Sequence, residues 1–305
     1  MQQGRSHEVT AKLMLVGVTF AWGLTWPAMR LALSDIPPFS MRTASLAVGA
    51  VTLYALARLQ GRSLRIKDRR TWVHVGVIAV LNMVIFSICS AFGQLLAPTG
   101  RIAMLVYTMP IWASLMARFA LGERFTPAGM LALLLCCIGM TVLIYPLAFS
   151  GVPTGPLLAL CAAIGWAAGT VYMKWARIAV DPIAIALWQV VIAFFILAAC
   201  IPVFQDSVHV FDAHPMALVG VLFSGMFGSG LAYFLWYNVI SVLPAMTASL
   251  GVLSAPIIGV ISSVILLGER PTTTDIIGYV LIFAASACIL LQPQGGRVRP
   301  DPAGG

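Results

Sequence analysis

The sequence predicts an all-α polytopic membrane protein, in which ten transmembrane helices form two inverted five-helix repeats. Three observations predict this fold class: a low content of charge, a series of long apolar stretches, and motifs that recur in the second half of the chain. Only 9% of the 305 residues are charged, 60% are hydrophobic, and the mean hydropathy is +0.97. Soluble domains carry about 25% charged residues because their surfaces face water. A chain with so little charge must be surrounded by lipid.

The apolar stretches have the length of membrane spans. A bilayer core about 30 Å thick requires about 20 apolar residues per helix. Prolines near the starts of several stretches suit the first turn of a helix. The first stretch is too long for the core of a signal peptide, so we expect it to be retained. The expected spans are 12–32, 39–59, 72–92, 99–120, 127–147, 154–175, 182–203, 215–238, 244–267 and 275–292.

The distribution of Lys and Arg predicts the orientation of these spans. With both termini in the cytoplasm, fourteen of the 18 basic residues lie on the inner side and four on the outer side, as the positive-inside rule requires. The basic segment 58–70 then becomes a cytoplasmic loop, and 204–214 lies outside. No nucleic-acid-binding module surrounds the basic segment, so we expect no nucleic-acid partner. The Gly- and Pro-rich tail, 293–305, is expected to be disordered in the cytoplasm.

The six cysteines all lie inside apolar stretches, without a CxxC pair or a metal-ligand spacing. Buried free cysteine packs as a small apolar residue. We therefore expect no disulfide framework, no metal site and no cofactor.

Several motifs recur at a nearly constant distance along the chain. Leu121-Gly122-Glu123-Arg124 matches Leu267-Gly268-Glu269-Arg270 at an offset of 268 − 122 = 146, and Trp22 matches Trp166 at 166 − 22 = 144. The chain is thus interpreted as a duplicated unit, with one repeat at 1–147 and a second at 148–292. Five spans is an odd number, so the two copies cross the membrane in opposite senses. Inverted repeats of this kind are typical of secondary transporters, which bind substrate near the bilayer midplane between the repeats.

These repeated motifs carry a resemblance to a known family. The chain resembles the EamA-type family of the drug/metabolite transporter superfamily over about residues 12–292. The matching pieces are Phe20-Ala21-Trp22-Gly23, Pro38-Phe39-Ser40-Met41-Arg42, and the stretch Pro110 through Gly122-Glu123-Arg124, which recurs as Pro256 through Gly268-Glu269-Arg270. The resemblance implies an exporter or facilitator of small organic metabolites, such as amino acids, amines or drug-like compounds, in a bacterial cytoplasmic (inner) membrane.

Alternating access around a central cavity is the leading hypothesis for function. A membrane-embedded enzyme would need a chemical constellation such as HExxH, and the sequence has none. A channel would need rings of polar residues along a pore, and the expected spans contain too few of them. A non-transport membrane scaffold would leave the duplication unexplained. The acidic residues all lie at or beyond the span ends, which disfavours a carboxylate proton relay and favours facilitated diffusion or exchange.

The candidate substrate-binding residues are aromatic or polar side chains within the spans. Trp22 and Trp166 lie near span midpoints, where an interfacial aromatic belt does not explain them. Aromatic pockets with a few polar groups are normal small-molecule sites. The alternative is that these side chains pack or face lipid. The full candidate set is Trp22, Trp26, Arg42, Asn82, Tyr107, Trp166 and Tyr233.

Three further features have both a structural and a functional interpretation. Arg42, about 5 Å into its span, could bind a substrate carboxylate, but its shallow depth favours snorkelling or helix packing. Glu123 and Glu269 could bind protons, but capping glycines precede them and favour helix-end roles near the start of the following helix. The prolines within spans are expected to bend helices and shape a cavity: Pro27, Pro110 and Pro256.

Overall fold

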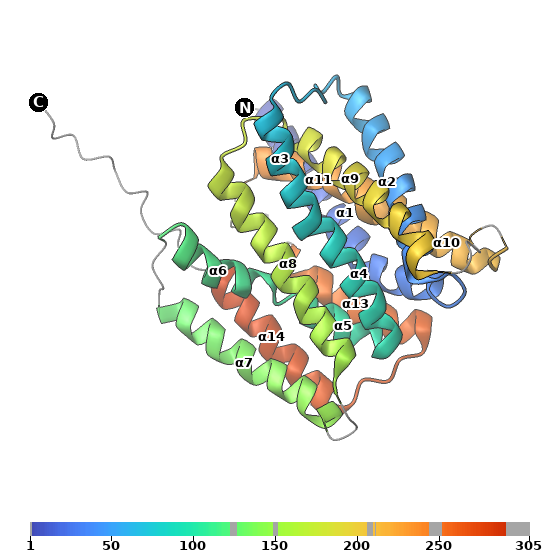
Figure 1. Cartoon of the computed structure of the whole chain (residues 1–305). Helices are drawn as coiled ribbons and strands as arrows, with labels where there is room; N and C mark the ends of the chain where they lie inside the picture. The colour runs from blue at the N-terminus through green and yellow to red at the C-terminus, as the bar shows by residue number, and fades with distance from the viewer. Residues whose placement is uncertain are drawn as a thin grey trace, which may run out of the picture.

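The chain forms a bundle of helices (Figure 1). The computed structural model describes residues 2–122, 127–148, 152–205, 210, 212–243 and 252–290, and no strand occurs among them. The helices are α1 (Gln2–Ala32), α2 (Pro38–Leu59), α3 (Arg69–Ile78), η1 (Ala79–Ile85), α4 (Phe86–Leu96), α5 (Thr99–Val106), α6 (Met109–Ala120), α7 (Pro127–Ala148), α8 (Thr154–Ala176), α9 (Pro182–Phe204), α10 (Pro215–Phe223), η2 (Ser224–Leu231), α11 (Ala232–Val242), α13 (Ser254–Leu267) and α14 (Thr273–Leu290).

Eight helical stretches are long and apolar enough to cross a membrane. They correspond to the first eight expected spans and run from Val9–Ala32 to Pro215–Ile240. The last two apolar helices, Ser254–Leu267 and Thr273–Cys288, are shorter. Part of the expected span 244–267 and the expected tail 293–305 lie outside the described residues. The count of ten spans therefore stays a prediction.

Two of the spans contain a π-helical segment at equivalent places. The segment η1 joins α3 to α4, and η2 joins α10 to α11. Their first residues, Ala79 and Ser224, are 224 − 79 = 145 positions apart, close to the offset of the repeated motifs. A π-helical turn is wider than an α-helical one and occurs often at functional sites. These π-helical segments were not predicted from the sequence.

The prolines of the repeated motif lie at helix starts, not inside continuous helices as expected. Expected span 99–120 divides at Tyr107 and Thr108 into α5 and α6, and Pro110 occupies the first turn of α6. Its repeat partner Pro256 is the third residue of α13. A proline lacks a backbone N–H, so the first turn tolerates it while a helix interior does not. Pro27, by contrast, lies inside α1 as expected.

Helices from the two halves of the chain pack closely against each other. The most extensive pairings are α7 with α14, α2 with α9 and with η2, α1 with α13, and α4 with α8. Figure 1 shows α7 and α14 side by side. A Cβ atom on Gly139 would lie 2.9 Å from Ile282, and one on Gly278 would lie 2.5 Å from Leu143. Glycine at these two positions therefore allows the close approach, as small residues do between membrane helices.

The Gly-Glu-Arg motifs end helices, but Glu269 has a different partner from the one expected. Gly122 follows α6 with φ +71°, and Gly268 caps α13 with φ +67°, which confirms the prediction for these glycines. Its carboxylate accepts hydrogen bonds from the backbone N–H groups of Thr99 and Gly100, at the start of α5. Glu269 thus has the structural, helix-end role that the sequence favours, but at the N-terminus of α5, which the folded bundle brings to this carboxylate. Glu123 lies outside the described residues.

Candidate functional site

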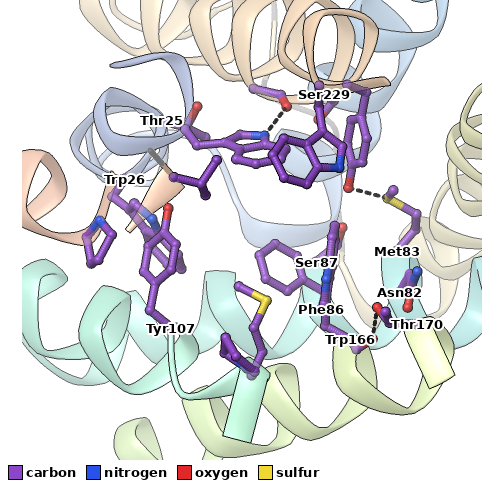
Figure 2. A pocket seen from close by; sticks show the side chains of 18 of the residues that line it. Thr25, Trp26, Asn82, Met83, Phe86, Ser87, Tyr107, Trp166, Thr170 and Ser229 are labelled. Atoms are coloured by element: carbon purple, nitrogen blue, oxygen red, sulfur yellow. Dashed lines mark hydrogen bonds between the residues drawn. The ribbon is translucent and has the colours of Figure 1, made fainter. Parts of the chain in front are cut away.

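A cavity of about 400 Å³ lies between the two halves of the chain. This volume is in the range of small-molecule sites, about 300–1,000 Å³. The first half of the chain contributes residues of α1, α2, η1, α4, α5 and α6 to the wall of the cavity. The second half contributes residues of α8, α9, η2, α11, α13 and α14. Figure 2 shows Trp26 and Tyr107 on one side of this space and Trp166 on another.

All seven candidate residues from the sequence line this cavity: Trp22, Trp26, Arg42, Asn82, Tyr107, Trp166 and Tyr233. Some of the other aromatic residues lie away from the cavity. Trp72 packs against Trp188, with ring centroids 4.7 Å apart, and neither contributes to the wall. The two repeat-related prolines, Pro110 and Pro256, are also part of the wall. Because the chain turns into a new helix at each of them, they help to leave the space open.

Aromatic rings form a continuous wall. The centroid of Trp166 lies 5.1 Å from that of Phe86 and 6.1 Å from that of Tyr233, on which it stacks. Trp22 meets Tyr233 edge-on at 6.1 Å and Trp236 at 5.7 Å. Such pairs stabilise one another beyond the burial of area. The wall therefore offers flat apolar faces that are held in fixed orientations.

The indole of Trp22 is anchored to the π-helical segment η2. Its Nε1 donates a hydrogen bond to the carbonyl of Gly228, at 3.3 Å. Gly228 must be small, because a Cβ atom there would lie 2.6 Å from Thr25 Oγ1. The wide turn in the second half thus holds an aromatic side chain of the first half in place.

Arg42 is buried within the bundle, which contradicts the expectation that it snorkels to the headgroups. Only 7% of the residue is exposed. Nε donates to the backbone carbonyl of Ser87 at 3.1 Å, and Nη2 donates to Ser90 Oγ at 3.0 Å. The guanidinium carbon lies 5.9 Å from the centre of the Phe86 ring. α2 is oriented so that position 42 faces α4. The hydrogen-bond acceptors on α4 bind the guanidinium in place of the lipid headgroups. Helix packing, the other structural interpretation, is thus correct, and the side chain lines the cavity as well.

Two buried amides belong to the wall. Asn82 is in η1, and Gln189 is in α9. Asn82 Oδ1 and Gln189 Oε1 are both buried without a hydrogen-bond partner among the described residues. A Cβ atom on Gly169 would lie 1.8 Å from Asn82 Oδ1, so glycine at 169 makes room for this amide. Buried polar atoms normally have a partner, and the few exceptions tend to occur at functional sites.

Several residues of the wall were not predicted from the sequence. Trp236 and Tyr237 follow Tyr233 by three and four positions and line the cavity with it. Residues at this spacing share one face of a helix, so extending the choice of Tyr233 along its face would have found both. Gln189 is harder to find, because a single amide in an apolar span has no periodic signal.

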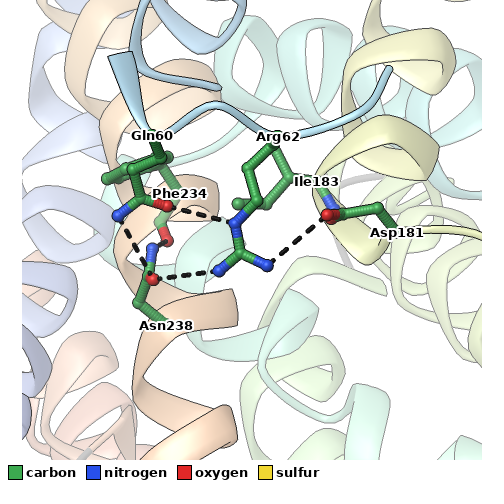
Figure 3. Close-up of polar contacts among 6 residues, drawn as sticks. All are labelled: Gln60, Arg62, Asp181, Ile183, Phe234 and Asn238. Atoms are coloured by element: carbon green, nitrogen blue, oxygen red, sulfur yellow. Dashed lines mark hydrogen bonds and ion pairs between the residues drawn. The ribbon is translucent and has the colours of Figure 1, made fainter. Parts of the chain in front are cut away.

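Polar contacts at one end of the bundle join the two halves (Figure 3). Arg62, in the segment after α2, reaches Asp181 at the start of α9, with Nη1 and Oδ2 3.4 Å apart. Its Nη2 lies 3.5 Å from Asn238 Oδ1 in α11, and Gln60 Nε2 lies 3.4 Å from the same oxygen. The distribution of basic residues assigns all these segments to the cytoplasmic side.

A second set of contacts joins segments that the distribution of basic residues assigns to the outer side. His214 donates a backbone hydrogen bond to Asp35. Arg101 and Asp275 form a buried ion pair, with Nη2 and Oδ1 2.6 Å apart. Polar contacts thus join the two halves of the chain on both of these sides.

The site offers binding and no evident reaction chemistry. Arg42 is the one charged residue among the described residues that line the cavity, and none of them is acidic. The described part of the chain has no group of three His, Cys, Asp or Glu side chains placed to hold a metal ion. Flat aromatic faces, two amides and one guanidinium can hold a small amphipathic molecule.

Comparison with known proteins identifies the family. The model of the EamA-like transporter family matches residues 9–145 and again 153–291. The protein named Uncharacterized transporter YoaV, from Bacillus subtilis, is 26% identical over 284 residues, which cover 90% of this chain and 94% of that protein. The Aromatic amino acid exporter YddG of Ancylobacter novellus is 28% identical over 291 residues, covering 91% and 96%.

Further comparisons agree. The Probable terminal-alkyne amino-acid exporter of Streptantibioticus cattleyicolor is 22% identical over 288 residues, covering 93% of this chain and 94% of that protein. A crystal structure with 22% sequence identity superposes with a TM-score of 0.66, covering 92% of this chain and 96% of that chain, which shows a shared fold. This multi-pass membrane protein belongs to the EamA-like transporter family, and it is a transporter, not an enzyme.

Proposed function

We propose that the chain is a secondary transporter that moves small organic metabolites by alternating access, each half rocking about the central cavity. The observation that carries this proposal is the cavity itself, whose wall is built from both halves of the chain. A site shared between halves can be exposed to either side in turn when the halves tilt. The polar contacts at the two ends, Arg62 with Asp181 and Arg101 with Asp275, are contacts that such a motion would break and remake.

The proposal includes an inverted duplication of ten spans, with repeats at 1–147 and 148–292. Three observations support it: the family model matches twice, the π-helical segments are 145 positions apart, and the repeat partners Trp22 and Trp166 reach the same cavity. We place the protein in the bacterial cytoplasmic membrane, with both termini in the cytoplasm and the tail, 293–305, disordered there.

Amino acids are the first substrates to test. Two relatives are named as exporters of amino acids, and a cavity of about 400 Å³ with aromatic faces fits molecules of this size. Amines and drug-like compounds are the next class. We propose export or facilitated exchange, without a requirement for an inward proton gradient, because no acidic residue lines the cavity among those described.

The proposal is tested by counterflow in proteoliposomes. Purified protein is reconstituted into vesicles loaded with a millimolar unlabelled amino acid, and the entry of the same radiolabelled compound is followed. Saturable entry that requires the internal compound indicates a carrier. A channel would give entry that does not depend on the internal compound, together with an electrical current. A scaffold would give the same entry as protein-free vesicles for every compound of the panel, and that result would contradict the proposal.

A further inference from the structure

Arg42 is a buried cation that has no acidic partner among the described residues. Two other arginines are paired with carboxylates, Arg62 with Asp181 and Arg101 with Asp275. In the described part of the chain, Arg42 instead contacts a backbone carbonyl, a serine hydroxyl and an aromatic ring. Burying a charge without a counter-charge is costly in an apolar medium, and ionisable groups inside membrane spans tend to mark substrate paths. The structure therefore has an unmatched positive charge at the wall of the cavity.

The guanidinium also retains hydrogen-bonding capacity. An arginine side chain has five N–H groups. Hydrogen bonds to the described residues Ser87 and Ser90 use two of them, one on Nε and one on Nη2, so three remain. Both N–H groups of Nη1 are among these three. A guanidinium with free, adjacent N–H groups matches the geometry of a carboxylate, which accepts two parallel hydrogen bonds.

An aromatic wall begins directly beside this cation. The Phe86 ring lies 5.9 Å from the guanidinium carbon, Trp166 lies 5.1 Å from Phe86, and Tyr233 lies 6.1 Å from Trp166. A flat apolar molecule can lie along these rings while an acid group at its end reaches Arg42. No acidic side chain among the described residues of the wall would pair with a positive group on such a molecule.

We propose that the cavity selects organic acids that have one carboxylate and a planar apolar body, with Arg42 as the carboxylate receptor. An α-ammonium group is not required for binding. This inference rests on the proposed function and goes further, because it makes the acid group, rather than the amino acid as a whole, the feature that is recognised. Neutral amides and simple amines of the same shape are then rejected.

The competing explanation is that Arg42 only fastens α2 to α4 through Ser87 and Ser90. A purely structural role would change the stability of every variant but not the order in which related ligands bind. The ligand ranking is therefore the decisive measurement.

The test uses four compounds that share a phenyl body: 3-phenylpropionate, its amide, phenethylamine and phenylalanine. Their affinities for the purified full-length protein in detergent are measured by isothermal titration calorimetry at constant ionic strength. We expect 3-phenylpropionate and phenylalanine to bind at least tenfold more tightly than the amide and the amine. In Arg42→Gln this preference for acids is lost, whereas Arg42→Lys retains part of it because the positive charge remains. Arg58→Gln is the matched control, since Arg58 is exposed on the same helix and does not line the cavity.

The inference is overturned if the amide binds as tightly as the acid, if the amine binds more tightly, or if Arg42→Gln keeps the preference for acids. The wild-type ranking decides even if Arg42→Gln fails to fold. Counterflow with the same compounds separates the two proposals. If the amine is exchanged and the acids are not, the protein is a carrier and the inference about acids is wrong. If none of the compounds binds, the inference is wrong as well, while counterflow with the wider amino-acid panel still judges the carrier proposal.

Discussion

Trp22 and Trp166, which are 144 positions apart in the sequence, share Tyr233 as a neighbour: each ring centroid lies 6.1 Å from the centroid of Tyr233. Trp22 meets it edge-on, and Trp166 stacks on it. One tryptophan comes from each half of the chain, and both line the cavity. Tyr233 therefore links an indole of the first half to an indole of the second half, and the following prediction concerns these two indoles.

Replacing Trp22 or Trp166 with alanine is expected to weaken binding of the best ligand by up to about tenfold, or ~1.4 kcal/mol. Each substitution removes an aromatic face from the wall. Trp72→Ala is the control, because Trp72 packs against Trp188 away from the cavity. Affinity is measured by titration calorimetry, and membrane insertion by the yield of monodisperse protein. Normal binding by both cavity variants would remove these indoles from the site.

Gly169→Ala is expected to displace the Asn82 amide, since the added Cβ atom would lie 1.8 Å from Asn82 Oδ1. Overpacking of this kind costs about 1–3 kcal/mol. In Asn82→Ala the conflict is absent, so the double variant should resemble Asn82→Ala alone in both thermal stability and ligand affinity. Residues in contact show such non-additive effects. Strictly additive losses in the double variant would mean that the two residues do not compete for this space.

Charge reversal at the Arg62–Asp181 contact is expected to alter the rate of transport more than the affinity for ligand. The pair is partly exposed, with side-chain exposures of 38% and 20%, so its contribution to stability is at most about 1 kcal/mol. It joins the two halves at one end, however, and like charges there would favour separation. Arg62→Asp and Asp181→Arg should each change the counterflow rate, and the double reversal should restore it. Wild-type rates in both single variants would exclude a role in closing this end.

Asp275→Asn is expected to lower the free energy of unfolding by about 3–5 kcal/mol, because it leaves a buried guanidinium without its charge partner. Arg101 and Asp275 have side-chain exposures of 9% and 7%. Asp275 also accepts hydrogen bonds from the backbone N–H and the hydroxyl of Thr272. Replacing the pair together, as Arg101→Met with Asp275→Leu, should cost less than Asp275→Asn alone. Thermal unfolding in detergent gives the ranking, and the opposite order would contradict this account.

Cysteine labelling tests the orientation. In a background without the six native cysteines, Ser63→Cys in the exposed segment between α2 and α3 should react with a membrane-impermeant reagent only after the cells are permeabilised. Ser207→Cys, whose position lies outside the described residues, should react in intact cells. The reason is the excess of Lys and Arg on the side of segment 58–70. Reaction of Ser63→Cys in intact cells would reverse the assigned orientation.

The sequence alone determined the class of protein, eight of the spans, and the residues of the aromatic wall that recur in both halves. These follow from properties that can be read along one helix at a time: apolar length, turn residues and motif repetition. Trp22 and Trp166 were found in this way, because duplication gives them equivalent places before any packing is known.

The tertiary structure decided where polar side chains point and which partners they find. α2 is apolar around most of its surface, so its pattern of residues does not show which face is interior. At its shallow depth, the side chain of Arg42 could bind either the lipid headgroups or the carbonyl of Ser87. Glu269 accepts hydrogen bonds from the N-terminus of α5. One expected span is interrupted at Tyr107, and two others contain π-helical segments that begin at Ala79 and Ser224. Each of these outcomes depends on how neighbouring helices are rotated and how closely they approach. In lipid, the partner of a polar group is determined by the helix that packs against it, and the sequence around that polar group does not specify which helix this is.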